Sequence, residues 1–311
     1  MAVVANTFTT YAAIGMREDL SDVIDIISPT DTPFYSALKK SKASARYFEW
    51  QTDALAAAAN NAQIEGDDVA SFTAVTPTTR WGNYAQISTK NFVISDTEEI
   101  VDKAGRKSEI AWQTKKKLSE LKRDAETALI QNGTFNAGAV GTARQTRGLA
   151  GWITQGSVGA GAGVFPVPST NTAAVAGTAR AFSEALVKSA MQTAYVAGGA
   201  PTMLLVRPAD KVIASSFAGN ATRYEDADSG KLHAAFDVYV TDFGALKIVP
   251  DRFQDAAAYL VDLEHVSFKT LRNVERKPLA KTGDAEKMLI TWEYGLQMDN
   301  KDAHAQIRDL T

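Results

Sequence analysis

Cysteine is absent from this chain of 311 residues, so neither disulfide bonds nor thiolate chemistry can contribute to its stability or function. No stretch of about 18 consecutive apolar residues occurs, which excludes a membrane-spanning helix. The first ten residues, MAVVANTFTT, lack a basic region followed by an apolar core, so we expect no signal peptide. These absences suit a protein that folds in the cytosol.

An excess of charge of one sign is also lacking. The chain has 33 Lys and Arg against 36 Asp and Glu, a formal net charge of −3. A dedicated nucleic-acid-binding protein would carry a basic excess, so the composition argues against that class. The 45% apolar and 22% charged content is that of an ordinary globular protein, long enough for one large or two ordinary domains.

Motifs for catalysis, cofactor binding and metal binding are missing as well, so we predict no catalytic, cofactor-binding or metal-ligating residue. His233, His265 and His304 have no carboxylate or second histidine at metal-ligand spacing. Residues 226–230 (DADSG) resemble the opening of a calcium loop without its closing glutamate. The glycines of residues 156–163 are not followed by a Gly-Lys-Ser/Thr or a helix start. These absences favour a structural protein over an enzyme.

The longest helical signal covers residues 95–133. Ser95 and Glu98 fit a capping box, and Gly105 separates a short lead-in from a main helix that starts near Lys107. We expect the pair Asn132-Gly133 to end the helix in the left-handed conformation. About 25 helical residues would form a rod of roughly 38 Å, which is long for a globular domain.

The two sides of this predicted helix differ in character. One is expected to be a buried apolar stripe, formed by Ala111, Leu118, Leu121, Ala125 and Leu129. The opposite side is basic and carries Lys115, Lys116, Lys117, Lys122 and Arg123. That basic face is either solvated or a docking surface for neighbouring subunits.

Residues 46–51 and 80–95 are rich in aromatic and β-branched side chains and predict two strands. A structureless connection of about 26 residues between them is improbable inside a compact domain. We therefore predict a long hairpin whose tip projects from the body and requires a partner. Trp50 and Trp81, near its base, are interpreted as local packing residues, with interface anchors as the alternative.

Before this hairpin, residues 1–16 resemble an extended arm, residues 17–27 predict a short amphipathic helix, and residues 30–33 predict a turn. After the long helix, helices and strands alternate from about residue 180 to 262, which predicts a compact α/β unit. Residues 266–271 and 287–297 alternate as strands, and residues 303–310 are expected to extend the last strand to the terminus. The obvious surface for these strands to pack on is the long helix.

This order of parts resembles the major capsid protein of tailed double-stranded DNA phages, and several stretches are similar to the family typified by the phage SU-ten major capsid protein. They are residues 27–34 (ISPTDTPF), 101–110 (VDKAGRKSEI), 120–124 (ELKRD), 238–244 (VYVTDFG), 279–284 (LAKTGD) and 300–310 (NKDAHAQIRDL). The similarity extends over nearly the whole chain.

The resemblance implies an α+β protein of the Hong Kong 97-type capsid fold. Its expected parts are an N-terminal arm and short helix (1–45), an extended-loop hairpin or E-loop (46–95), a P-domain with a spine helix (96–179), an A-domain (180–262) and C-terminal P-domain strands (263–311). The resemblance also implies self-assembly through hexamers and pentamers into an icosahedral shell around double-stranded DNA, without sequence-specific binding or catalysis.

The implied partners are further copies of the chain together with portal, scaffold and decoration proteins, and no membrane. The implied location is the virion, after assembly in the bacterial cytoplasm. Some relatives crosslink a lysine to an asparagine between subunits, but Lys90 beside Asn91 does not match a crosslinking motif. Two other readings stay open: an encapsulin-like nanocompartment shell, and a monomeric hydrolase or binding domain with an unrecognised site.

Overall fold

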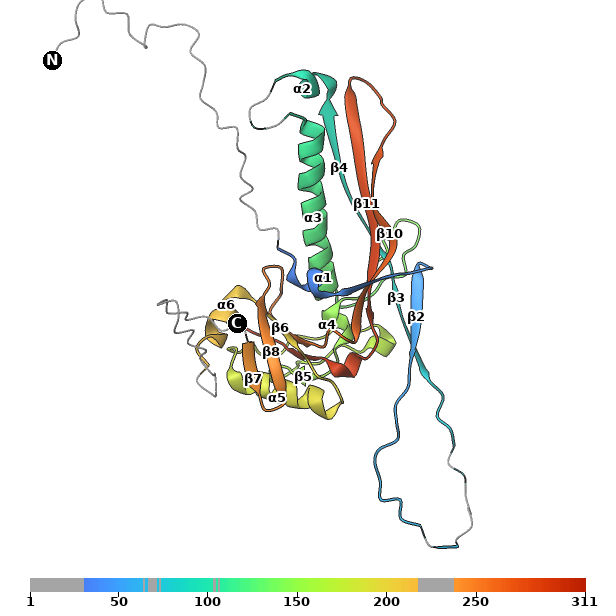
Figure 1. Ribbon diagram of the computed structural model, residues 1–311, viewed down its shortest axis with the longest axis vertical. Helices are drawn as coiled ribbons and strands as arrows, with labels where there is room; N and C mark the ends of the chain where they lie inside the picture. The colour runs from blue at the N-terminus through green and yellow to red at the C-terminus, as the bar shows by residue number, and fades with distance from the viewer. Residues whose placement is uncertain are drawn as a thin grey trace, which may run out of the picture.

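The computed structural model describes residues 31–63, 65–66, 72, 74–102, 105, 107–217 and 238–311. Its longest helix, α3 (Glu109–Gln131), lies beside a four-stranded sheet, and an α/β unit built on a six-stranded sheet adjoins one end of this pair (Figure 1). A two-stranded hairpin projects away from both (Figure 1). Within the described ranges, no helix is long and apolar enough to cross a membrane.

The four-stranded sheet has the order β1-β10-β11-β4, in which β1 is parallel to β10 and the other pairs are antiparallel. Its strands are β1 (Lys39–Lys42), β10 (Val266–Pro278), β11 (Ala285–Met298) and β4 (Gln86–Ser95). The predicted C-terminal strands are confirmed, and β10 is longer than expected. The sheet therefore unites segments from both ends of the chain.

The lead-in to the long helix has the predicted form. In α2 (Asp96–Ile100), the Ser95 hydroxyl accepts a hydrogen bond from the Glu98 backbone N–H at 3.2 Å. Gly105, with φ +76°, then interrupts the helix. The Glu99 carboxylate accepts the backbone N–H groups of Glu109 and Ile110 at 2.9 and 3.2 Å, which places negative charge at the positive end of α3.

The buried stripe of α3 is shorter than predicted. Leu121, Ala125 and Leu129 are buried, whereas Leu118 is half-buried at the edge of the core and Ala111 is exposed. The core gathers at the C-terminal half of α3, where the short helices α1 (Pro33–Ala37) and α4 (Leu149–Trp152) also pack. The first turns of α3 lack these two neighbours, which explains the exposure of Ala111.

The end of α3 also differs from the prediction. Asn132 is extended, with φ −63° and ψ 108°, rather than left-handed. Its side-chain amide donates to the Thr146 carbonyl at 2.9 Å and to the Gln86 side chain at 3.2 Å. Contacts with segments distant in sequence therefore end the helix, and no local signal could reveal them.

The predicted α/β unit is present in the described residues. Its sheet has the order β5-β12-β9-β6-β8-β7. The strands are β5 (Gly156–Ser157), β12 (Ala305–Ile307), β9 (Ala258–Val261), β6 (Met203–Val206), β8 (Gly244–Pro250) and β7 (Val238–Thr241), and the helices are α5 (Glu184–Val196) and α6 (Pro208–Ala214). As predicted, α5 ends before a glycine: Gly198 has φ +85°.

Strands β6 and β9 are buried on both faces because each separates two cores. Met203 and Leu205 belong to the core of α3, while Leu204 and Val206 belong to the core of α5. Side chains of a strand alternate between its faces, so four consecutive apolar residues fit this position. The shared strands join the α/β unit to α3 and the four-stranded sheet, which together are called the spine region below.

The predicted extension of the last strand over residues 303–310 is wrong. A 3-10 turn, η3 (Lys301–Ala303), follows β11, and β12 then pairs with β9 and β5 in the six-stranded sheet. Leu310 lies in the core of α5. The C-terminal residues thus leave the four-stranded sheet and complete the α/β unit.

Two N-terminal predictions also change. Within the turn expected at residues 30–33, Pro33 is instead the first residue of α1 and Thr32 precedes it as the N-cap residue, while residue 30 lies outside the described residues. The single strand expected at residues 80–95 is two strands, β3 (Thr79–Tyr84) and β4, separated at buried Ala85. The predicted helix at residues 17–27 and the loop at 226–230 lie outside the described residues.

His304 lies at the junction between η3 and β12 and is fully buried. Its Nδ1 accepts the Asp262 backbone N–H at 3.0 Å, which places the ring hydrogen of the neutral form on Nε2. Burial lowers the pKa of His304 from 6.5 to about 4. The fold therefore favours the neutral imidazole.

We expect Leu121→Ala to lower the free energy of unfolding by about 2–5 kcal/mol, because it removes a buried side chain from a packed core. Lys122→Ala, at the next and exposed position, should change it by less than about 0.5 kcal/mol. Urea denaturation followed by tryptophan fluorescence measures both. Equal effects would contradict the assignment of the buried face.

His304 should make the fold sensitive to acid. Because its pKa is lower in the folded state, its contribution is complete above pH 6.5 and is lost as the pH falls toward 4, by up to about 3 kcal/mol. His304→Gln keeps an acceptor for the Asp262 N–H without a titrating ring and should flatten this part of the profile. Denaturation midpoints measured from pH 7 to 4 test this, and identical slopes in both proteins would refute it.

Candidate assembly surfaces

The hairpin is the largest projection of the described chain (Figure 1). Its base consists of β2 (Tyr47–Thr52) paired antiparallel with β3. Beyond the base, Leu55, Phe72 and Val75 are 99%, 91% and 93% exposed. Apolar side chains held this far from the body gain burial only against another surface.

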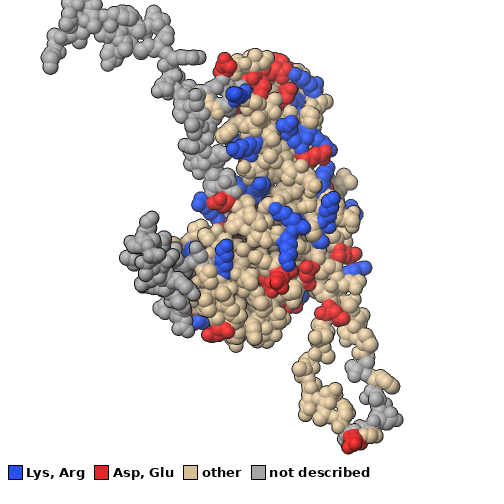
Figure 2. All heavy atoms as spheres, viewed as in Figure 1, with Lys and Arg blue, Asp and Glu red and all other residues tan. Residues whose placement is uncertain are grey.

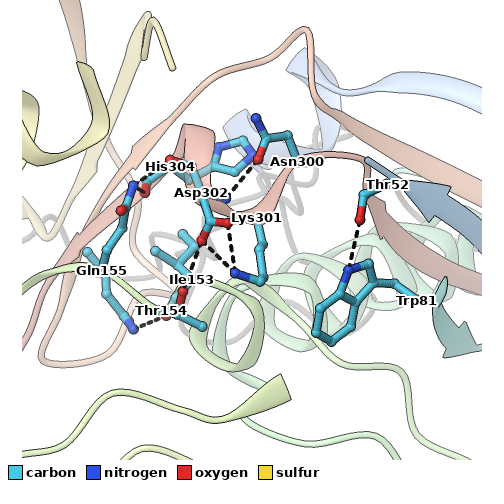
Figure 3. A network of polar contacts seen from close by, with 10 residues as sticks. Thr52, Trp81, Ile153, Thr154, Gln155, Asn300, Lys301, Asp302 and His304 are labelled. Carbon is cyan, nitrogen blue, oxygen red and sulfur yellow. Dashed lines mark hydrogen bonds and ion pairs between the residues drawn. The ribbon is translucent and has the colours of Figure 1, made fainter. Parts of the chain in front are cut away.

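Trp50 and Trp81 attach the hairpin base to the body, which confirms their interpretation as local packing residues. Their rings lie 5.3 and 6.1 Å from the buried ring of Trp152 in α4. The indole N–H of Trp81 donates to the Thr52 hydroxyl at 3.1 Å, which links the two strands (Figure 3).

Arg147 packs against Trp152, the residue on which Trp50 and Trp81 rest. The sequence does not predict this role for Arg147. Its guanidinium is buried and lies over the rings of Phe135 and Trp152, at 4.8 and 4.5 Å from the ring centroids. It also donates to the Pro168 carbonyl and the Asn171 side chain at 3.1 and 2.7 Å. Burial lowers the pKa of Arg147 to about 10, so it stays charged at neutral pH.

A second buried polar residue, Asn83 of β3, completes the attachment. Its amide donates to the carbonyls of Arg147 and Leu296 at 3.0 and 2.7 Å, and its oxygen accepts the Arg147 backbone N–H at 2.9 Å. Asn83 therefore holds the hairpin to both the loop before α4 and the strand β11. In the sequence, Arg147 is followed only by Gly148 and a short apolar run. This pattern is the only sequence signal for the arrangement.

A polar network lies beside the hairpin base (Figure 3). The Asp302 carboxylate forms an ion pair with the Lys301 ammonium at 2.6 Å and accepts a hydrogen bond from the Thr154 hydroxyl at 3.3 Å. The Gln155 amide donates to the carbonyls of Asp302 and His304. These contacts connect η3 with the segment after α4.

An open groove of about 510 Å³ borders this network. Its lining includes Trp81 of the hairpin, Lys301 of η3 and the apolar segment from Val164 to Pro168, which contains the start of η2 (Pro168–Thr170). Val164 and Val167, two of its apolar residues, are 52% and 41% exposed. The groove therefore places a second exposed apolar surface on the body, beside the base of the hairpin.

The basic residues predicted for α3 are divided between two environments. Lys115, Lys116 and Lys122 are exposed, whereas Lys117 pairs with Glu120 at 2.9 Å and Arg123 lies 5.2 Å from the Phe253 ring. Lys and Arg side chains are spread along the upper part of the molecule, where α3 lies beside the four-stranded sheet. Acidic side chains gather at the top of this part and near the base of the hairpin (Figure 2). Lys90, considered above for crosslinking, pairs with Asp124 at 2.6 Å.

The described residues bring together no group of three or more histidine, cysteine or acidic side chains that could hold a metal ion. His304 is buried, His265 is partly exposed 4.0 Å from Asp262, and His233 lies outside the described residues. Gly156, one of the clustered glycines, has φ +124° and faces the Gln306 backbone, where a Cβ would lie 2.1 Å from the carbonyl oxygen. Its role is close packing of β5 on β12.

Comparison with known proteins identifies the family. Residues 3–311 match the family model described as SU10 major capsid protein. A curated major capsid protein of Escherichia phage Phieco32 is 29% identical over 331 residues, covering 94% of this chain and 94% of the relative.

Solved structures share the fold at low sequence identity. The capsid of a native GTA particle matches with a TM-score of 0.66 and 12% identity, over 99% of this chain and 100% of that one. The SrpI encapsulin complex from Synechococcus elongatus PCC 7942 matches with a TM-score of 0.53 and 10% identity, over 96% and 93%. The arrangement of helices and strands is the Hong Kong 97-type capsid fold, as predicted. The match of the family model over nearly the whole chain establishes that the protein belongs to the SU10 major capsid protein family.

Proposed function

We propose that copies of this major capsid protein assemble, as hexamers and pentamers, into the icosahedral head shell that encloses the double-stranded DNA of a phage. The observation that carries this proposal is the hairpin. Its base is fixed by buried polar and aromatic contacts, while its apolar side chains beyond the base have no cover within the described chain. A neighbouring subunit supplies the missing surface.

The elements of the fold can be assigned to the parts of a capsid subunit. We propose that α3 and the four-stranded sheet form the P-domain, that the six-stranded sheet with α5 and α6 forms the A-domain, and that the β2–β3 hairpin forms the E-loop. The pairing of β12 with β9 supports assigning the C-terminal residues to the A-domain, although the sequence placed them in the P-domain. The pairing of β1 with β10 likewise supports assigning residues 39–42 to the P-domain and not to the N-terminal arm.

The enclosed DNA is proposed to be held without sequence-specific contacts and without catalysis. A net charge of −3 supports this, because an inner surface with a strong basic excess would bind the phosphate backbone during packaging. Portal, scaffold and decoration proteins are the further partners we propose. The shell is proposed to assemble in the cytoplasm of the bacterial host and to remain in the virion.

The two alternatives have less support. A nanocompartment shell would use the same fold, but the match over residues 3–311 is to a family of phage major capsid proteins. The contents of purified particles, nucleic acid or protein cargo, separate these two functions. A monomeric hydrolase or binding protein would leave the exposed hairpin without a purpose.

Deleting residues 55–76 should leave a folded subunit that does not assemble, because β2, β3 and their anchor on Trp152 stay intact while the exposed apolar side chains are lost. Electron microscopy measures assembly, and thermal unfolding followed by tryptophan fluorescence checks the fold. Intact shells formed by the deletion variant would remove the argument for an intermolecular hairpin.

A further inference from the structure

Two segments of the chain carry opposite charge. Residues 38–46 contain basic residues and no acidic one: Lys39, Lys40, Lys42 and Arg46. Residues 53–79, in the hairpin, contain acidic residues and no basic one: Asp53, Glu65, Asp67 and Asp68, of which Asp67 and Asp68 lie outside the described residues. Each segment therefore has a strong local charge that the net charge of the chain conceals.

Strand β1 presents the basic segment at an edge of the four-stranded sheet, where its one strand partner in the described chain is β10. Lys39, Lys40 and Lys42 are exposed, and none of them forms an ion pair with a described acidic side chain. Lysines on an edge strand hinder indiscriminate strand pairing. The same positive charge favours an acidic partner over others.

Acidic side chains of the neighbouring strands do not neutralise this edge. Glu275 of β10 pairs with Lys277 at 3.2 Å, and Glu293 of β11 lies 3.6 Å from Arg272. The Ser41 hydroxyl oxygen, between the lysines of β1, is buried without a hydrogen-bond partner among the described residues. The edge thus has both charge and hydrogen-bonding capacity to spare.

An open groove of about 530 Å³ borders β1 and adds an apolar contact surface. Its lining includes Lys40, Lys42 and the aromatic residues Tyr35 and Trp292, whose rings meet edge to face at 5.5 Å. Val274, also in the lining, is 42% exposed. We call these lysines, with Lys39 and the groove, the β1 surface. It combines apolar side chains with a positively charged rim.

The hairpin tip has the complementary composition. Glu65 and Gly66 lie in a turn, and Gly66 has φ +79°. Phe72, a few residues further on, is 91% exposed. Figure 2 shows an acidic side chain at the end of the hairpin. An aromatic ring and carboxylates therefore project together.

We propose that the hairpin tip of one copy docks on the β1 surface of a second copy. Its carboxylates pair with the lysines of β1, and Phe72 enters the groove beside them. The same subunit does not make this contact, because its hairpin extends from an anchored base away from the sheet that contains β1 (Figure 1). This inference rests on the proposed assembly and names the surface that covers the hairpin.

Exchange of charge between the two segments of the full-length protein tests the docking. Lys40→Glu with Lys42→Glu should slow assembly by about tenfold or more, because like charges then face each other. Glu65→Lys with Asp67→Lys should do the same. A chain that carries all four changes restores opposite charges and should recover assembly. Light scattering measures the rate, and electron microscopy identifies the particles.

A matched control separates local pairing from net charge. Lys115→Glu with Lys116→Glu makes the same change of charge at two exposed positions of α3. Combined with the hairpin reversal, it should not recover assembly. Thermal unfolding followed by tryptophan fluorescence checks that each variant folds.

Carbodiimide crosslinking of the assembled, unmodified protein provides a second measurement that needs no variant. This reagent joins carboxylates to lysines in direct contact. Mass spectrometry should find peptides in which residues 65–68 of one copy are linked to residues 39–42 of another. Crosslinks from residues 39–42 to other acidic segments only would contradict the proposal.

The outcomes distinguish this inference from the proposed function. If the unmodified protein forms shells but the chain with all four changes does not, the docking is wrong and the shell stands. If the β1 reversal blocks assembly and the hairpin reversal does not, another acidic segment, such as residues 18–25, occupies β1 and the proposal fails. An unmodified protein that stays monomeric would instead refute the proposed assembly.

Discussion

The structure depends on the two-sided burial of strands β6 and β9. One face of each strand belongs to the core of α3 and the four-stranded sheet, and the other face to the core of α5. Neither core could form without these strands, so the spine region and the α/β unit share a wall.

The hairpin lies outside both cores, and the contrast between its base and its tip explains its role. Arg147 and Asn83 fix the base through buried hydrogen bonds, and three tryptophans pack there. A projection with a fixed base loses less conformational freedom when it binds than a free loop would. In the proposed shell, its exposed apolar side chains would thus be presented in a limited set of positions to a neighbouring subunit.

Local signals in the sequence predicted much of this fold. The capping serine at position 95, the break at Gly105, the apolar spacing of Leu121, Ala125 and Leu129, and the alternation in β11 all act through neighbouring residues. The predictions that were wrong concern features that do not depend on neighbouring residues. Asn132 ends α3 through Thr146 and Gln86, Ala85 separates two strands that join different sheets, and β12 pairs with β9 across the fold. These features are set by contacts between distant segments, which periodicity and propensity do not report.

The proposed assembly surface could be predicted only in outline from the sequence, because a long connection poor in large apolar residues indicates a projection but not its anchor. Arg147 was missed since a buried cation held by aromatic rings and carbonyls has no characteristic spacing. The central claim is that the hairpin is covered by another copy of the chain. Sedimentation of the full-length protein, with electron microscopy of the particles formed, tests it most directly. The account predicts capsomers or closed shells in which residues 53–78 lie on a neighbouring subunit, and a stable monomer of 33.4 kDa would contradict it.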